Sequence, residues 1–215
     1  MLKAGLTGSI AVGKTVVCDV FRELGCRVLD ADLTAREVVK PGTDGLAKIV
    51  KEFGREMLLP DGSLDRKKLG ALVFADEAKR EKLNEIVHPL VSAEQDRWLS
   101  ENEKSFPDSI SIVDAALMIE SGGYKRFDRL IVVWCEPDIQ LRRLMNRDGI
   151  DAAAAAQRIA VQMPQVEKKK FADHLIDTSK GFEDARRQVS RVFHELTVFK
   201  DETCETTKGK PTPHE

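Results

Sequence analysis

The sequence lacks the features that would place a protein in a membrane or a secretory compartment. No apolar run approaches the roughly 20 residues that a membrane-spanning helix needs. The N-terminus reaches a glycine turn at Gly8 too soon to hold the apolar centre of a signal peptide. The four cysteines are scattered, with no CxxC pair and no metal-binding His/Cys spacing, so we expect reduced thiols. These absences predict a cytoplasmic protein without a membrane partner.

The chain also lacks an excess of charge of either sign. Its 34 Lys and Arg residues nearly balance its 36 Asp and Glu residues, for a net charge of -2. Such a balance gives no overall attraction to nucleic acid, so any anion site must be local. The length of 215 residues suits one domain with an insertion. We expect the protein to be a monomer or a small homo-oligomer.

Strands and helices alternate along most of the sequence. A strand, a glycine loop, a helix and a second strand open the chain, and this order is typical of a parallel sheet. We therefore predict an α/β fold with a five-stranded parallel sheet flanked by helices. The expected strands are residues 2–6, 27–30, 110–114, 130–134 and 174–177.

The stretch from about residue 34 to 102 differs, because it is mostly helical and heavily charged. We expect it to form a helical insertion between strands of the core. A final helix is expected over residues 182–198, and the polar, aperiodic residues 200–215 are expected to form a mobile tail. Three apolar faces mark the insertion: Ala47, Ile49, Val50 and Phe53; Leu69, Leu72, Val73 and Phe74; and Leu83, Ile86, Val87 and Leu90.

A phosphate-binding loop is the strongest motif. Residues 8–15, Gly-Ser-Ile-Ala-Val-Gly-Lys-Thr, match G-x-x-x-x-G-K-[ST] between an expected strand and an expected helix. Gly8 and Gly13 permit the backbone angles that turn N–H groups toward a phosphate. Lys14 can reach the β- and γ-phosphates, and the Thr15 hydroxyl can bind Mg²⁺. The residues assigned to ATP binding here are Gly8, Ala11, Val12, Gly13, Lys14, Thr15 and Val16.

Three carboxylates lie at the ends of expected strands. Asp30 and Asp32 lie at the predicted C-terminal end of the second strand, and we expect one to act as a base and the other to cap the next helix. Asp114 ends the third strand, where it could bind Mg²⁺ through water or simply terminate the strand in a turn. Glu120 is a weaker candidate for the same metal site.

Two arginines, Arg143 and Arg147, share one face of an expected helix because they are four residues apart. Guanidinium groups on one face suit a lid that closes over ATP and stabilises the transferring phosphoryl group. The alternative is a solvated basic face, and the spacing alone favours that alternative.

Taken in order, these motifs resemble the dephospho-CoA kinase family from Leu6 to about Ala185. The step Asp-Ala-Asp followed by A-R-x-V-V-x-P-G is far more selective than the phosphate loop. The matching segments are GLTGSIAVGKT, VLDADLTAREVVKPG, DGSLDRKKLGALVF, HPL, VDAALMIESG, QLRRLMNRD and QRIAVQMPQVEKKKFADHLID.

The resemblance implies a P-loop kinase fold over residues 1–199, divided into three parts. The implied parts are a nucleotide-binding core (about 1–33, 105–136 and 172–199), a helical CoA domain (about 34–104) and a lid (about 137–171). It implies Mg-ATP as donor and the ribose 3′-hydroxyl of dephospho-CoA as acceptor. It implies that Asp32 is the base and that Arg143, with Arg147, approaches the phosphates. On the acceptor side we assign Arg36, His88, Asp114 and Leu117.

Some positions depart from the family pattern. Ser9 and Ala11 replace loop glycines, the usual proline before Leu117 is Ala116, and Thr178 replaces an asparagine near the adenine. Without the family, His88 would be read as a helix-ending residue before Pro89.

Three other functions remain open on the residues alone. A kinase for a nucleoside monophosphate or another small metabolite would share the core. A GTPase-like switch is disfavoured because N-K-x-D is absent. A non-catalytic scaffold would not need Lys14, Thr15, Asp32 and Arg143 together.

Overall fold

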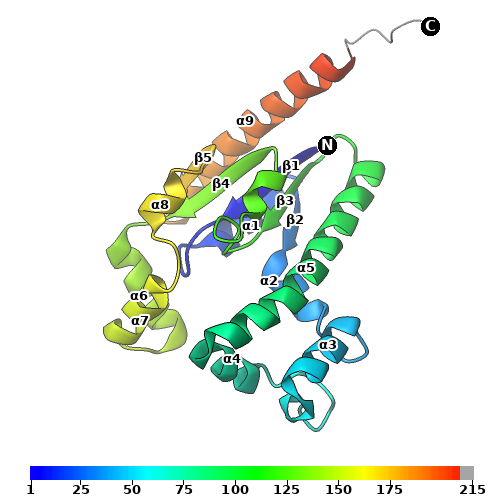
Figure 1. The fold of residues 1–215 in the computed structure, drawn as a ribbon. Helices are drawn as coiled ribbons and strands as arrows, with labels where there is room; N and C mark the ends of the chain where they lie inside the picture. The colour runs from blue at the N-terminus through cyan, green and yellow to red at the C-terminus, as the bar shows by residue number, and fades with distance from the viewer. Residues whose placement is uncertain (209–215) are drawn as a thin grey trace, which may run out of the picture. The chain divides into compact units, whose positions relative to one another are not determined.

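The computed structural model describes the backbone of residues 1–208 and the side chains of residues 1–203. All five predicted strands are confirmed to within one residue at either end. They form one sheet in the order β2-β3-β1-β4-β5 (Figure 1). The strands are β1 (Leu2–Thr7), β2 (Arg27–Asp30), β3 (Ile110–Asp114), β4 (Arg129–Trp134) and β5 (His174–Asp177).

The sheet is parallel, as predicted. β1 pairs in parallel with both β3 and β4, and β4 pairs in parallel with β5. The central strands are almost entirely buried, which is why they read as continuous apolar runs. The carboxyl ends of β1 and β3 therefore meet at one edge, where Leu6 is in register with Asp114.

Helices α1 (Lys14–Glu23) and α9 (Phe182–Lys208) pack against each other, and α9 also contacts β5 (Figure 1). Their apolar faces complete the main core, in which Phe21, Val189 and Leu196 are fully buried. This core fixes the start of α1, and with it the end of the loop that follows β1.

Helix α9 is longer than predicted, because it runs to Lys208 rather than ending near Val198. The expected tail is therefore wrong for residues 200–208. Apolar periodicity stops where α9 no longer packs on the core, but the first glycine after Phe182 is Gly209, so nothing breaks the helix earlier. The rest of the expected tail, residues 209–215, lies outside the described residues.

The chain divides into two compact units, Met1–Leu29 with Asn102–Glu215, and Asp30–Glu101. The second unit is helical, and its core contains Leu46, Ile49, Phe53 and Leu69. Its elements are α2 (Ala31–Glu37), α3 (Asp44–Phe53), the 3-10 turn η1 (Arg55–Met57), α4 (Arg66–Ala75) and α5 (Glu77–Ser105), which continues past the end of the unit.

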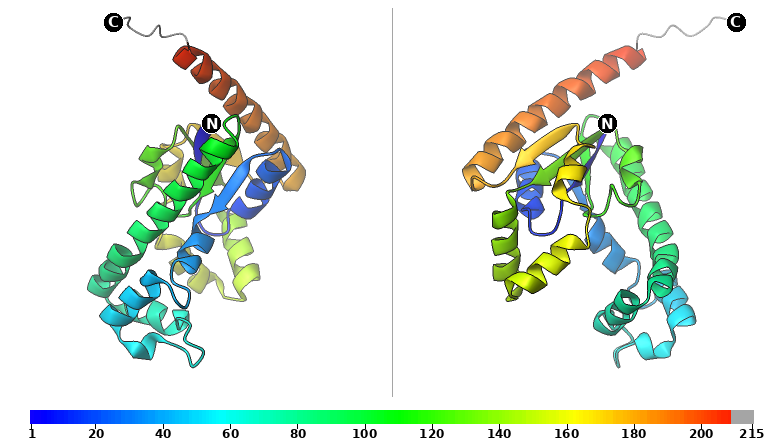
Figure 2. Two further views of the ribbon diagram at one scale, coloured as in Figure 1. Left: turned by 90° about the vertical axis from the view of Figure 1, so that its right-hand side faces the viewer. Right: turned by 60° about the vertical axis from the view of Figure 1, so that its left-hand side comes forward.

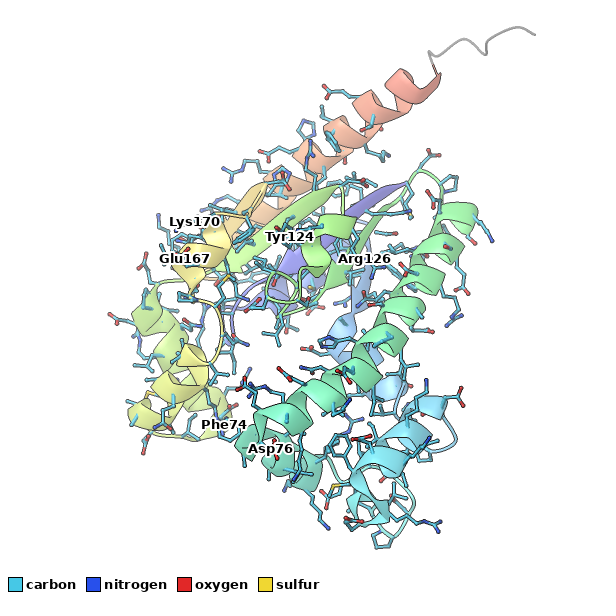
Figure 3. The ribbon with its side chains drawn as sticks, viewed as in Figure 1. Phe74, Asp76, Tyr124, Arg126, Glu167 and Lys170 are labelled. Atoms are coloured by element: carbon cyan, nitrogen blue, oxygen red, sulfur yellow. The ribbon has the colours of Figure 1, made fainter. Side chains whose placement is uncertain are left out.

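Two residues of this unit, Ala47 and Phe74, were wrongly assigned to the buried apolar faces. Ala47 is exposed, and its neighbour Leu46 is buried in its place. Phe74 is 78% exposed on α4, near its junction with α5 (Figure 3). Leu69, Leu72 and Val73 follow the helical repeat toward the core, so Phe74 is turned about 100° away from that face.

The interpretation of His88 as a helix-ending residue is also wrong. Helix α5 continues through His88 and contains Pro89 in its interior. Proline is disfavoured in a helix interior because it lacks an N–H donor and crowds the preceding turn. The helix nevertheless continues, and Ile86 and Val87 in that preceding turn pack on the core of the helical unit.

Along the chain, three further helices of the first unit come between β4 and β5, and one short 3-10 turn follows β3 (Figure 2). Within the described residues, no helix has both the length and the apolar composition needed to cross a membrane. These elements are η2 (Gly123–Arg126), α6 (Pro137–Asp148), α7 (Ala152–Ala160) and α8 (Gln165–Lys169). We refer to residues 137–169 as the α6–α8 segment.

Candidate active site

The loop of residues 8–13 joins the end of β1 to the start of α1, which is the structural context that the motif requires. Glycine is required at Gly8, because a Cβ atom there would lie 2.4 Å from the backbone oxygen of Val133. Gly13 has φ of 90°, in the left-handed region that glycine adopts easily. The loop is thus closed tightly against β4 and turns directly into the N-terminus of α1, a favourable place for a phosphate.

Lys14 and Asp114 lie together beside this loop. The Lys14 Nζ atom is 3.6 Å from Asp114 Oδ1, and both side chains are largely buried. On the other side of the carboxylate, the Cys18 thiol donates a hydrogen bond to Asp114 Oδ2 at 3.5 Å. Burial and the adjacent Asp114 carboxylate raise the pKa of the Cys18 thiol, so it stays protonated and remains a donor. Asp114 is therefore oriented toward the loop rather than into solvent.

Arg143 contacts the loop from α6 through Thr178. Its Nη1 donates to Thr178 Oγ1 and its Nη2 donates to the Thr178 carbonyl, both at 2.8 Å. The Thr178 hydroxyl in turn donates to the carbonyl of Val12 at 2.6 Å. A Cβ atom at Gly13 would lie 3.5 Å from Arg143 Nη1, so the guanidinium lies directly against the loop.

Arg147 is engaged differently from Arg143, although both are on α6. Its Nε donates to Asp148 Oδ1 at 2.7 Å, and more than half of its side chain is exposed. Asp148 also pairs with Arg158 of α7. The structure brings Arg143 to the loop and holds Arg147 in an ion pair within the α6–α8 segment.

The donor set near the loop suits Mg²⁺. The exposed Thr15 hydroxyl and the Asp114 carboxylate supply oxygen atoms, which are the ligands that this cation prefers. Among the described side chains, no group of three or more His, Cys, Asp or Glu residues could hold a metal by itself. A magnesium ion here would complete its coordination with water and phosphate oxygens, as is usual for Mg-nucleotides.

Comparison with known proteins gives consistent results. The family model described as "Dephospho-CoA kinase" matches residues 2–184. A dephospho-CoA kinase of Listeria innocua is 46% identical over 187 residues, which cover 86% of this chain and 92% of the relative. The chain belongs to the dephospho-CoA kinase family. The five-stranded parallel sheet, with the phosphate loop between β1 and α1, confirms the predicted α/β fold of the P-loop kinase type.

Solved structures agree with the family assignment. The dephospho-CoA kinase from Campylobacter jejuni is 28% identical, with a TM-score of 0.69 and coverage of 91% of this chain and 96% of that one. A protein from Thermus thermophilus, 29% identical, reaches a TM-score of 0.75 over 91% of this chain and 97% of its own. The fold is therefore shared over almost the whole chain.

Of the residues that the family pattern assigns to the acceptor, Arg36 and His88 lie in the helical unit, as do Asp30 and Asp32. Asp30 caps α2, since its Oδ1 accepts from the N–H groups of Asp32 at 2.8 Å and Leu33 at 3.0 Å. Asp32 is exposed in the first turn of α2, so of the two carboxylates Asp30 is the helix cap. Arg36 lies in the last turn of α2, and its carbonyl accepts from Arg66 Nη2.

Two further acceptor-side candidates, His88 and Leu117, are exposed to solvent. His88 is exposed on α5, within the helical unit. Leu117 is 52% exposed in the loop that follows β3, in the same unit as Asp114. In α1, Val16 is 40% exposed, whereas Val12 is fully buried at the loop.

Three consecutive lysines of the dephospho-CoA kinase motif have different environments, which the sequence could not show. Lys168 is fully buried, and its Nζ donates to the carbonyl of Ala116 at 2.7 Å and pairs with Glu120 at 2.9 Å. Lys169 lies over the ring of Trp134, and Lys170 pairs at the surface with Glu167 (Figure 3). Burial lowers the pKa of Lys168, and the Glu120 carboxylate opposes part of that shift. Glu120 is thus an ion-pair partner of α8, and Lys168 carries no sequence pattern that would predict this pairing.

Proposed function

We propose that this chain transfers the γ-phosphoryl group of ATP to the ribose 3′-hydroxyl of dephospho-CoA, giving CoA and ADP. In this reaction the 3′-oxygen forms a bond to the γ-phosphorus, and the bond from that phosphorus to the bridging oxygen of ADP breaks. The observation that carries the proposal is the family match over residues 2–184, together with a complete phosphate loop at its start.

Lys14 and Arg143 would provide the positive charge at the reacting phosphate. Phosphoryl transfer depends mainly on positioning and on neutralising charge, since little covalent chemistry falls to the protein. The N–H groups at the start of α1 and the Lys14 ammonium would bind the β- and γ-phosphates. The contact of Arg143 with Thr178 holds its guanidinium beside the same loop, which supports a role in the transition state.

Asp32 would accept the proton of the attacking hydroxyl. Two capping hydrogen bonds hold the Asp30 carboxylate at the start of α2 through Oδ1, so Asp32 is the better candidate for this proton. Arg36, His88 and Leu117 would contact the acceptor. Arg147 would have to exchange Asp148 for a phosphate oxygen before it could assist Arg143.

Magnesium bound by Thr15, and by Asp114 through water, would neutralise charge on the phosphate oxygens.

Three cysteines of the chain, Cys18, Cys26 and Cys135, are free thiols. Free thiols are typical of reducing compartments, which supports a cytoplasmic location.

An ADP-release assay tests the proposed reaction directly. Purified protein with Mg-ATP would be given dephospho-CoA, AMP or adenosine, and the product's phosphate position would be read by NMR. Turnover with dephospho-CoA alone and a 3′-phosphate product is the expected result, while the Lys14→Ala variant should be inactive. Turnover confined to AMP or adenosine would overturn the assignment of dephospho-CoA as the acceptor. The absence of turnover with all three compounds would overturn the proposed kinase activity.

A further inference from the structure

Ala11 has an unusual backbone conformation for its residue type. It has φ of 60°, and it is the one residue other than glycine with positive φ among the described residues. An L-residue with a Cβ atom is strained in this left-handed region. Glycine would adopt the same backbone angle without this strain. Such strain persists only where the surroundings fix the backbone.

The residue before Ala11 is fixed on both sides of its backbone by glutamines. The Ile10 N–H donates to Gln162 Oε1 at 2.7 Å, and the Ile10 carbonyl accepts from Gln140 Nε2 at 2.8 Å. Gln140 lies in α6 with only 2% of its surface exposed, and Gln162 lies between α7 and α8. Both groups therefore come from the α6–α8 segment and reach the loop next to the strained residue.

A third glutamine fixes the orientation of the Gln140 side-chain amide. Gln165, the first residue of α8, accepts from the Cys135 N–H at 3.0 Å and donates to Gln140 Oε1 at 2.7 Å. The Cys135 N–H can only donate and the Ile10 carbonyl can only accept. The chain of amides between them is thus oriented in one way, and each amide group has a partner at both ends. We refer to Gln140, Gln162 and Gln165 as the glutamine clasp.

We propose that the glutamine clasp is a positioning device that holds the phosphate loop in its ATP-binding shape despite the left-handed Ala11. The inference rests on the proposed function, in which this loop binds the phosphates of ATP. In this chain the clasp supplies the rigidity that keeps Ala11 in place, and it ties the loop to the α6–α8 segment. Glycine at position 11 should remove much of the need for it.

The test is a double-mutant cycle on ATP binding. Gln162→Met keeps the side-chain volume but loses the acceptor for the Ile10 N–H. We expect it to weaken the equilibrium affinity for Mg-ATP, measured by calorimetry, about fivefold, within the range for one hydrogen bond. In an Ala11→Gly background the same change should cost less than about twofold, because the two sites are coupled. Gln157→Met, on the exposed side of α7, is the matched control and should have no effect.

The cycle distinguishes this role from a general structural one. Equal losses of affinity in the wild-type and the Ala11→Gly backgrounds would overturn the proposal, and so would no loss in either background. Gln165→Met, which breaks the chain at Gln140, is a second variant with the same expected pattern, and circular dichroism checks that each variant folds. If wild-type protein failed to bind Mg-ATP, the proposed function would fail rather than the clasp.

Discussion

The guanidinium of Arg143 holds both oxygen atoms of Thr178, the hydroxyl through Nη1 and the carbonyl through Nη2. Thr178 follows β5 directly, and its hydroxyl also donates to Val12 in the phosphate loop. One buried side chain therefore connects the end of a strand, the loop and the arginine of α6.

Thr178→Val should separate the role of this hydroxyl from that of the side-chain volume. It leaves the Val12 carbonyl without this donor and removes one of the two acceptors of Arg143. We expect kcat/KM for ATP to fall about tenfold, the effect of losing a hydrogen bond to a charged group. Steady-state kinetics measure it, and Thr178→Ser should restore most of the activity. Unchanged kinetics in the valine variant would show that the hydroxyl does not position Arg143.

Arg143→Ala should reduce kcat much more than it weakens ATP affinity, since its charge is proposed to act in the transition state. A loss of about 100-fold is typical of removing one such donor. Arg147→Ala should change kcat less than about fivefold, because its side chain is exposed and paired with Asp148. A loss of ATP affinity with kcat unchanged in the Arg143 variant would mean that it only binds ground-state ATP. Comparable losses in both variants would show that Arg147 acts with it.

Asp32→Asn should lower kcat by about tenfold or more while ATP affinity is retained, because the variant cannot accept the proton. The magnitude is modest because positioning dominates phosphoryl transfer. Asp30→Asn is the matched control, since asparagine caps helices about as well as aspartate. If Asp30→Asn lowered turnover and Asp32→Asn did not, the assignment of base and cap would be reversed.

The stability of the protein should fall at alkaline pH in part through Cys26. Burial raises the pKa of this thiol from 9.0 to about 12. Because the folded-state pKa is above the unfolded value, the thiol stabilises the fold fully below about pH 9. That contribution is lost as the pH rises toward 12. Urea unfolding from about pH 8 to about pH 10.5 should show a steeper loss for wild type than for Cys26→Ala, and parallel curves would contradict this.

Local sequence patterns were sufficient for the sheet and for the phosphate loop. The three central strands are short apolar runs next to turns, and burial on both faces makes such runs continuous. The edge strands β2 and β5 are shorter and only partly buried, but each still follows the pattern of apolar residues before an Asp. The glycines at the loop are required by its backbone, so Gly8 and Gly13 could be recognised from spacing alone. The sequence predicted that either Asp30 or Asp32 would cap the helix, but not which one. Both precede or begin the same expected helix, so their positions along the chain do not distinguish them.

Only the tertiary structure decided which polar residues act together. The glutamine clasp joins residues from three places along the chain, and Thr178 contacts Val12 across 166 positions. Nothing local distinguishes buried Lys168 from exposed Lys170, because burial depends on the packing of α8 against the loop after β3. The sequence determined the fold and the family, since both depend on periodicity and short motifs. The arrangement around the phosphate loop depends on long-range contacts, which only the folded chain creates.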